Sequence, residues 1–158
     1  MKSKEVLEIL KQKKLTISFA ESMTGGRVIS ELIKHAGASL VCELGLVVYS
    51  TQMKEELLDI SKEDIRQYGV VSKMISMIMA ENVSMKSLSN VGVGITGNAG
   101  PTIDSSGNLG EVWVSIFILG EMHSYHFQFN SLPREEIIEK TTQSVFRLLL
   151  TLLKEINL

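Results

Sequence analysis

A short polar run between a predicted strand and a predicted helix carries the residues best suited to chemistry. Residues 16–19 are mostly apolar or β-branched and predict a strand, and residues 27–34 have the apolar spacing of a helix. The run between them, residues 20–26, reads Ala-Glu-Ser-Met-Thr-Gly-Gly. Unpaired N–H groups at a helix start suit an anion or a developing oxyanion, and glycines admit a ligand close to the backbone. We expect a site here; the alternative is an ordinary strand-to-helix turn with Thr24 as N-cap.

Hydroxyl groups follow or end three predicted strands, at Ser22, Tyr49 and Thr96. If these strands are parallel, their carboxyl ends meet at the sheet edge where open α/β proteins bind ligands. Lys54 lies about one helical turn beyond the second strand and could lean over the same edge. A serine hydroxyl is a weak nucleophile until a neighbour takes its proton, and a lysine does this in Ser–Lys enzymes. We therefore expect Ser22 and Lys54 to form the catalytic pair.

Each of these residues also has a purely structural interpretation. Lys54 begins the run Lys-Glu-Glu, which is typical of an exposed helix face. Tyr49 could be a half-buried core aromatic, and Thr96 could stabilise a turn with its hydroxyl. Glu21 could orient Lys54 or the backbone of the turn, or it could be a surface carboxylate.

Composition excludes several classes of function. The 158 residues are 44% hydrophobic and 22% charged, which is typical of one globular domain with a substantial core. A net charge of −2 does not indicate a nucleic-acid or membrane surface. Three histidines and one cysteine offer no metal-ligand spacing, and Cys42 lies in an apolar run typical of the core. We expect a cytoplasmic domain over residues 1–158 that needs no cofactor or metal.

Alternating strands and helices predict the architecture that must position these residues. After a first helix at residues 3–14, the periodicity predicts these further elements: a buried strand at 44–50, helices beginning at 51, 61 and 72, a strand at 90–96, a hairpin of 111–119 and 122–130 that turns at Gly120-Glu121, and a helix beginning at Pro133. This order predicts an α/β fold: a three-layer α/β/α sandwich with a mixed, largely parallel sheet. The loop 97–110 is the longest irregular segment, and such loops are commonly functional.

Five motifs along the chain resemble those of one known family. They are Ala-Glu-Ser-Met-Thr-Gly-Gly at 20–26, Tyr49-Ser50 with Lys54, Gly-Val-Val-Ser at 69–72, Thr-Gly-Asn-Ala-Gly-Pro at 96–101 and Gly-Glu-Val-Trp at 110–113. In this order they resemble the CinA C-terminal domain family, the nicotinamide mononucleotide (NMN) deamidases. The resemblance covers nearly the whole chain and is to the stand-alone form, without the molybdopterin-binding-like domain of larger members.

The resemblance implies hydrolysis of the NMN carboxamide to nicotinate mononucleotide and ammonia, in pyridine-nucleotide salvage. It implies Ser22 as nucleophile and Lys54 as base, with Tyr49 and Thr96 assisting proton transfer or positioning the amide. The residues expected to bind substrate are Glu21, Thr24, Gly25, Gly26, Gly97, Ala99, Gly100 and Arg134. Backbone N–H groups near Thr24 and Gly25 are expected to hold the oxyanion or the phosphate. We also expect a homo-oligomer.

Some positions depart from the family pattern. Ile138 replaces a second arginine, Leu132-Pro133 replaces Gly-Asp, and residues 107–110 read Gly-Asn-Leu-Gly instead of Lys-Pro-Val-Gly. These changes fall where substrate recognition is expected. They leave as alternatives a nucleotide-binding module without catalysis, and an accessory protein linked to DNA uptake, although the acidic pI of about 5.9 argues against direct DNA contact.

Overall fold

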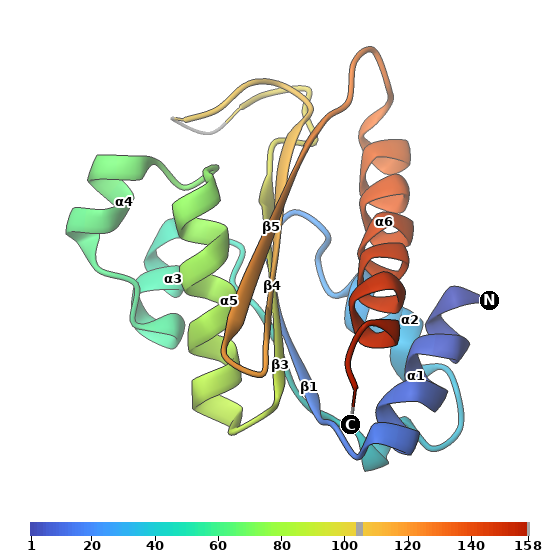
Figure 1. Ribbon diagram of the computed structural model, residues 1–158. Coiled ribbons are helices and arrows are strands. Elements are labelled where there is room, and N and C mark those ends of the chain that lie inside the picture. The colour runs from blue at the N-terminus through green and yellow to red at the C-terminus, as the bar shows by residue number, and fades with distance from the viewer. Residues whose placement is uncertain (104–105, 158) are drawn as a thin grey trace.

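Strands and helices follow one another along residues 1–103 and 106–157, the part of the chain that the computed structural model describes (Figure 1). In order they are α1 (Lys2–Lys13), β1 (Ile17–Glu21), α2 (Arg27–Ile33), the 3-10 helix η1 (Ala38–Leu40), β2 (Cys42–Val47), α3 (Thr51–Leu58), α4 (Lys62–Tyr68), α5 (Lys73–Ser87), β3 (Val91–Gly97), β4 (Glu111–Ile118), β5 (Glu121–Gln128) and α6 (Arg134–Lys154).

The strands form one sheet in the order β2-β1-β3-β4-β5. β2, β1 and β3 run parallel, whereas β4 is antiparallel to both of its neighbours. Helices α1, α2 and α6 cover one face, and α3, α4 and α5 cover the other (Figure 1). The predicted three-layer α/β/α sandwich with a mixed sheet is therefore confirmed.

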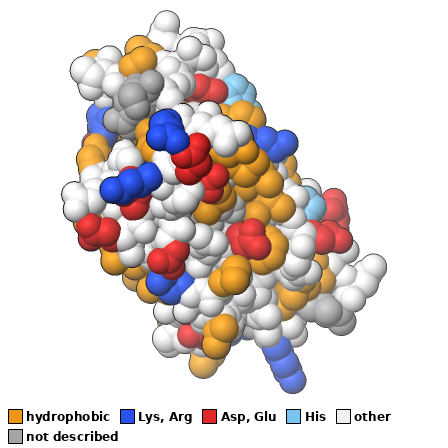
Figure 2. Space-filling view, turned by 90° about the vertical axis from the view of Figure 1, so that its left-hand side faces the viewer, with side chains coloured by type: hydrophobic (Ala, Val, Ile, Leu, Met, Phe, Trp, Pro, Cys, Tyr) orange, Lys and Arg blue, Asp and Glu red, His pale blue; other side chains and the backbone are white. Residues whose placement is uncertain are grey.

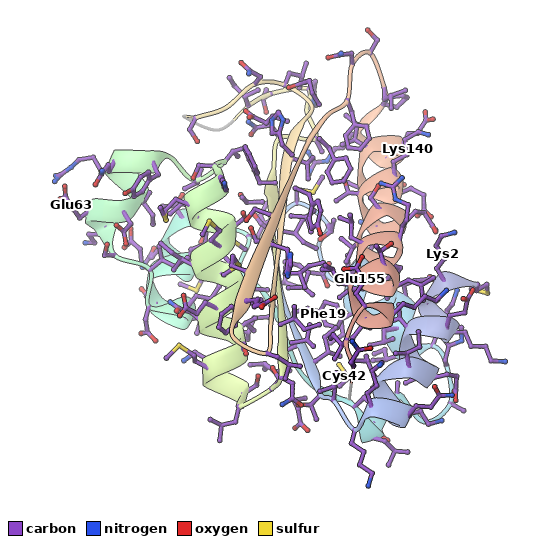
Figure 3. The ribbon with its side chains drawn as sticks, viewed as in Figure 1. Lys2, Phe19, Cys42, Glu63, Lys140 and Glu155 are labelled. Atoms are coloured by element: carbon purple, nitrogen blue, oxygen red, sulfur yellow. The ribbon has the colours of Figure 1, made fainter. Side chains whose placement is uncertain are left out.

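The core divides into two clusters because the central strands are buried on both faces. All five residues of β1 are buried, as parallel strands between helical layers require. Phe19 lies in the larger cluster, between the sheet and the layer that contains α1 and α6 (Figure 3). Its neighbour Ala20 belongs to the smaller cluster, under α3 and α5. The sheet is thus held from both sides next to the end of β1.

Three local predictions were wrong. β2 was predicted as a buried strand, but it is the edge of the sheet, and its residues alternate between partly buried and exposed. The hairpin turns at Leu119-Gly120, both with positive φ, instead of at Gly120-Glu121. Pro133 was placed at the first helical position, but it is the N-cap of α6.

Surface charge is mixed on the face formed by α3, α4 and α5. Acidic and basic side chains are interspersed there with hydrophobic ones (Figure 2). Such a face carries no extended field of one sign. None of the helices in residues 1–103 and 106–157 is both long and apolar enough to cross a membrane.

Candidate active site

Ser22 lies directly beyond the carboxyl end of β1, in the turn that leads to α2. Its N–H donates to the carbonyl of Ile95 in β3 at 3.2 Å, so the turn starts anchored to the sheet. The chain then reverses through Gly25 and Gly26, which have φ of 58° and 93°, values that glycine adopts without strain. Gly26 is the N-cap of α2, so the alternative assignment of Thr24 as N-cap is wrong.

Lys54 is buried beneath Ser22, with an exposed fraction of only 3%. The Ser50 hydroxyl caps α3 by accepting from the N–H of Met53, which starts the helix just past β2. Lys54, in the first turn, points inward, and its Nζ lies 3.1 Å from Ser22 Oγ. The interpretation of Lys54 as part of an exposed helix face is therefore wrong.

Two backbone carbonyls orient the lysine amine. Nζ donates to the carbonyl of Val48 at 2.9 Å and to that of Tyr49 at 3.4 Å. These hydrogen bonds hold the amine beside the serine hydroxyl. The distance of 3.1 Å from Nζ to Ser22 Oγ lies within the range for direct proton transfer. The arrangement can therefore support a nucleophilic serine with a lysine base.

A pocket of about 110 Å³ opens beside Ser22. Its walls are Ser22, Met23, Tyr49, Gly97, Asn98, Ala99, Thr102, Ile103 and Arg134. Five of these were expected as site residues, whereas Met23, Asn98, Thr102 and Ile103 were missed. Met23 and Asn98 lie inside the motifs at 20–26 and 96–101, and this position could have identified them as site residues. No such signal marked Thr102 and Ile103.

Tyr49 and Arg134 meet at this pocket although they are 85 residues apart in the chain. The Tyr49 hydroxyl accepts from Arg134 Nη2 at 3.1 Å, and Arg134 Nη1 donates to the carbonyl of Gly100 at 2.8 Å. Tyr49 is 63% exposed, so its interpretation as a half-buried core aromatic is wrong. Arg134 thus links the start of α6 to the loop after β3 and to Tyr49 in the segment between β2 and α3.

Other expected site residues do not line the pocket within the described part of the chain: Glu21, Thr24, Gly25, Gly26, Lys54, Thr96 and Gly100. Lys54 still reaches the site through Ser22, and Gly100 through Arg134. The Thr96 hydroxyl donates to the carbonyl of Val70 at 2.7 Å, which holds the 69–72 turn against β3.

The donors at the start of α2 are already in use. The Glu21 carboxylate accepts from the N–H groups of Gly26, Val28 and Ile29, at 3.2, 3.0 and 2.9 Å. The Gly25 N–H donates to the carbonyl of Ser22. The sequence had suggested these donors for a ligand anion. In this structure they donate instead to the Glu21 carboxylate and to the carbonyl of Ser22.

Asn98 shapes the loop that forms one wall of the pocket. Its buried amide donates to the carbonyls of Ser106 at 2.9 Å and Asn108 at 3.3 Å. The Ser106 hydroxyl accepts from the N–H of Val71, and the Glu111 carboxylate accepts from the N–H of Asn108, both at 2.9 Å. The part of the loop around Ser106 and Asn108 is thereby tied to Asn98, to Val71 and to the start of β4.

The departures from the family pattern lie outside the pocket wall. Ile138 is buried in the core cluster beneath α6, so this position faces the interior. Pro133 caps α6, Asn108 is bonded to Glu111, and Leu109 is half exposed. Among residues 1–103 and 106–157, no group of three or more His, Cys, Asp or Glu side chains is placed to hold a metal ion.

Fold and site together define an α/β/α domain with a serine–lysine pair at the carboxyl edge of its parallel strands. The chain belongs to the CinA C-terminal domain family, whose profile matches residues 1–153. A CinA-like protein of Flavobacterium psychrophilum is 35% identical over 143 residues, which cover 90% of this chain and 34% of that protein. A competence-damage inducible protein of Limosilactobacillus fermentum is 37% identical over 145 residues, 91% of this chain and 35% of that protein.

Solved structures of the superfamily share the fold. A CinA superfamily protein of Enterobacter cloacae is 27% identical with a TM-score of 0.92, over 96% of this chain and 90% of that one. A competence damage-inducible protein A of Klebsiella pneumoniae has a TM-score of 0.94 at 22% identity, over 99% of this chain and 97% of that one, which shows the fold alone. The chain spans about a third of the length of the curated relatives that it matches.

Proposed function

We propose that this domain hydrolyses the carboxamide of NMN to nicotinate mononucleotide and ammonia through an acyl-serine intermediate. The observation that carries the proposal is the distance of 3.1 Å between Lys54 Nζ and Ser22 Oγ, with both side chains buried at the edge of a pocket. A lysine amine in contact with a serine hydroxyl is an arrangement that supports metal-free acyl transfer. The substrate itself is proposed from the family resemblance.

In the first half of the reaction, Ser22 Oγ attacks the amide carbon and its proton passes to Lys54 Nζ. The carbonyl π bond opens to an oxyanion. The backbone N–H of Met23, the residue after the nucleophile, would donate a hydrogen bond to this oxyanion. The oxyanion then collapses, the C–N bond breaks, and Lys54 returns the proton to the departing nitrogen. Ammonia leaves and an ester of Ser22 remains.

In the second half, water replaces the ammonia. Lys54 takes a proton from the water as it attacks the ester carbon, and the proton then returns to Ser22 Oγ as the C–O bond to the enzyme breaks. Nicotinate mononucleotide is released and the resting pair is restored. Tyr49 and Arg134 at the mouth would position the substrate, and the guanidinium is a suitable partner for a phosphate.

The direct test measures ammonia released from NMN by the purified chain. We expect turnover by the native protein and a loss of about 10³-fold or more in Ser22→Ala and Lys54→Met. Lys62→Met removes an exposed lysine at the start of α4 and serves as the matched control, with native activity expected. Hydroxylamine added during turnover would trap the acyl group as a hydroxamate.

Two outcomes oppose the proposal. Turnover that is no higher than the Ser22→Ala background, across NMN and related pyridine carboxamides, would exclude the hydrolase. NMN binding that persists in Ser22→Ala, with no product from the native protein, would instead identify a nucleotide-binding module.

A further inference from the structure

The structure assigns Glu21 as a positioning residue that fixes the nucleophile Ser22 by capping α2 from the preceding strand. This inference rests on the proposed function for its kinetic readout. Glu21 is the last residue of β1 and is only 1% exposed. It precedes Ser22 directly, and it does not line the pocket, so its role is separate from substrate contact.

The Glu21 carboxylate gathers four donors from the segment that follows it. Thr24 Oγ1 donates to it at 2.6 Å, and the N–H groups of Gly26, Val28 and Ile29 donate at 3.2, 3.0 and 2.9 Å. A helix start leaves its first N–H groups unpaired, and the N-cap Gly26 has no side chain to receive them. Glu21 supplies the missing acceptor from the other side of the turn.

The consequence is a closed loop of contacts around Ser22. Its N–H donates to the carbonyl of Ile95 in β3, and its carbonyl accepts from the N–H of Gly25. The segment that follows it, from Thr24 to Ile29, is held by the Glu21 carboxylate. The backbone of Ser22 therefore has little freedom, and its side chain points at Lys54. A displacement of about 1 Å at a reacting atom costs about 100-fold in rate, so this closure bears directly on catalysis.

The same geometry separates the positioning role from simple stabilisation. Tyr49, Ala99 and Arg134, which line the pocket with Ser22, belong to other segments of the chain. The four hydrogen bonds described for the Glu21 carboxylate go to none of them. Weakening the hydrogen bonds of the Glu21 carboxylate should thus displace Ser22 and leave the other three side chains in position to contact the substrate. It should lower kcat while KM stays nearly constant.

The test compares Glu21→Gln with Val28→Ala, which removes buried packing from the same helix and leaves the carboxylate intact. Each variant is assayed for NMN turnover and for covalent labelling of Ser22 by an alkyl fluorophosphonate, with melting temperature as the measure of folding. We expect Glu21→Gln to lose about 10- to 100-fold in kcat and in labelling rate, with KM changed less than about twofold. We expect Val28→Ala to melt lower but to keep its labelling rate below the melting transition.

Native labelling and kcat in Glu21→Gln would overturn the inference, as would equal losses in both variants. If Glu21→Gln does not fold, Thr24→Val removes one of the four donors and should give a smaller loss of kcat and of labelling rate. Thr24→Ser keeps the hydroxyl donor and should retain the native rates. Failure of the proposed function is distinguishable: native protein would be labelled at Ser22 without releasing ammonia from NMN, and the labelling rates would still decide the role of Glu21.

Discussion

Ser22 and Lys54 approach within 3.1 Å because each follows a strand of the same parallel pair. β1 and β2 end at one edge of the sheet, and the chain beyond each end turns over that edge. The hydroxyl cap at Ser50 then sets the start of α3 so that Lys54 faces inward. At the residue scale, the pairing thus depends on strand direction and on one helix cap.

Cys42 gives a prediction at the same scale. Burial raises the pKa of its thiol to about 11, with a further contribution from the negative charge of Glu43. A raised pKa keeps the thiol protonated at pH 8, so the reactive thiolate fraction should be about 100-fold smaller than in the unfolded chain. Alkylation by iodoacetamide at pH 8, followed by mass spectrometry, should be slow for native protein and fast in urea. Equal rates would contradict the burial of Cys42 against the core.

Glu111, the first residue of β4, shows how one element controls a wall of the pocket. Its carboxylate accepts from the N–H of Asn108 and contacts His126 Nε2 at 2.8 Å. Partial burial raises the pKa of the Glu111 carboxyl, but these hydrogen bonds outweigh burial and hold the pKa below its usual value of 4.5. A lowered pKa stabilises the folded state above the unfolded value, and this contribution is lost as the pH falls through the folded value.

Replacing Glu111 with Gln should therefore loosen the loop and leave the Ser22–Lys54 pair in place. If the proposed function holds, KM for NMN should rise several-fold with a smaller change in kcat, which is the reverse of the pattern expected for Glu21→Gln. Steady-state ammonia release measures both constants. A fall in kcat at unchanged KM would show that the loop contributes to chemistry instead of binding.

The contact of α5 with β3 is set by glycine. A Cβ on Gly94 would lie 2.3 Å from the carbonyl oxygen of Ser76, which is backbone and cannot turn aside. Gly94→Ala should destabilise the protein by about 1–3 kcal/mol. Gly45→Ala is the control, since the nearest atom there is the flexible end of the Ile29 side chain. Urea denaturation compares the two, and equal stability would refute the close approach.

Stability of the whole molecule rests on the larger core cluster, which joins α1, α2 and α6 to one face of the sheet. Phe146 of α6 is fully enclosed in it. Phe146→Ala should cost about 3–5 kcal/mol, because it removes a large buried ring and leaves a cavity. Leu57→Ala, at a 41% exposed position on the opposite layer, should cost far less. Denaturation midpoints measure the difference, and similar losses would contradict this location of the core.

Element types could be predicted from the sequence because their signals are local. Apolar spacing marked the helices, and Ser50, Ser61 and Ser72 mark helix starts that the structure contains as side-chain caps. Neighbour relations carry no such local signal. β2 was predicted as buried because its residues are apolar, but its place at the sheet edge depends on which strands pair elsewhere.

By itself, the sequence determined the α/β architecture and the four residues proposed for chemistry, Ser22, Tyr49, Lys54 and Thr96, because strand ends and polar runs can be recognised along the chain. Only the tertiary structure decided which of them meet. In the structure Arg134 donates to the Tyr49 hydroxyl, the Thr96 hydroxyl donates to the carbonyl of Val70, and the Glu21 carboxylate accepts from N–H groups at the start of α2. Such contacts depend on packing between segments far apart in sequence, and hydrogen-bond donors are taken by whichever acceptor the fold brings nearest.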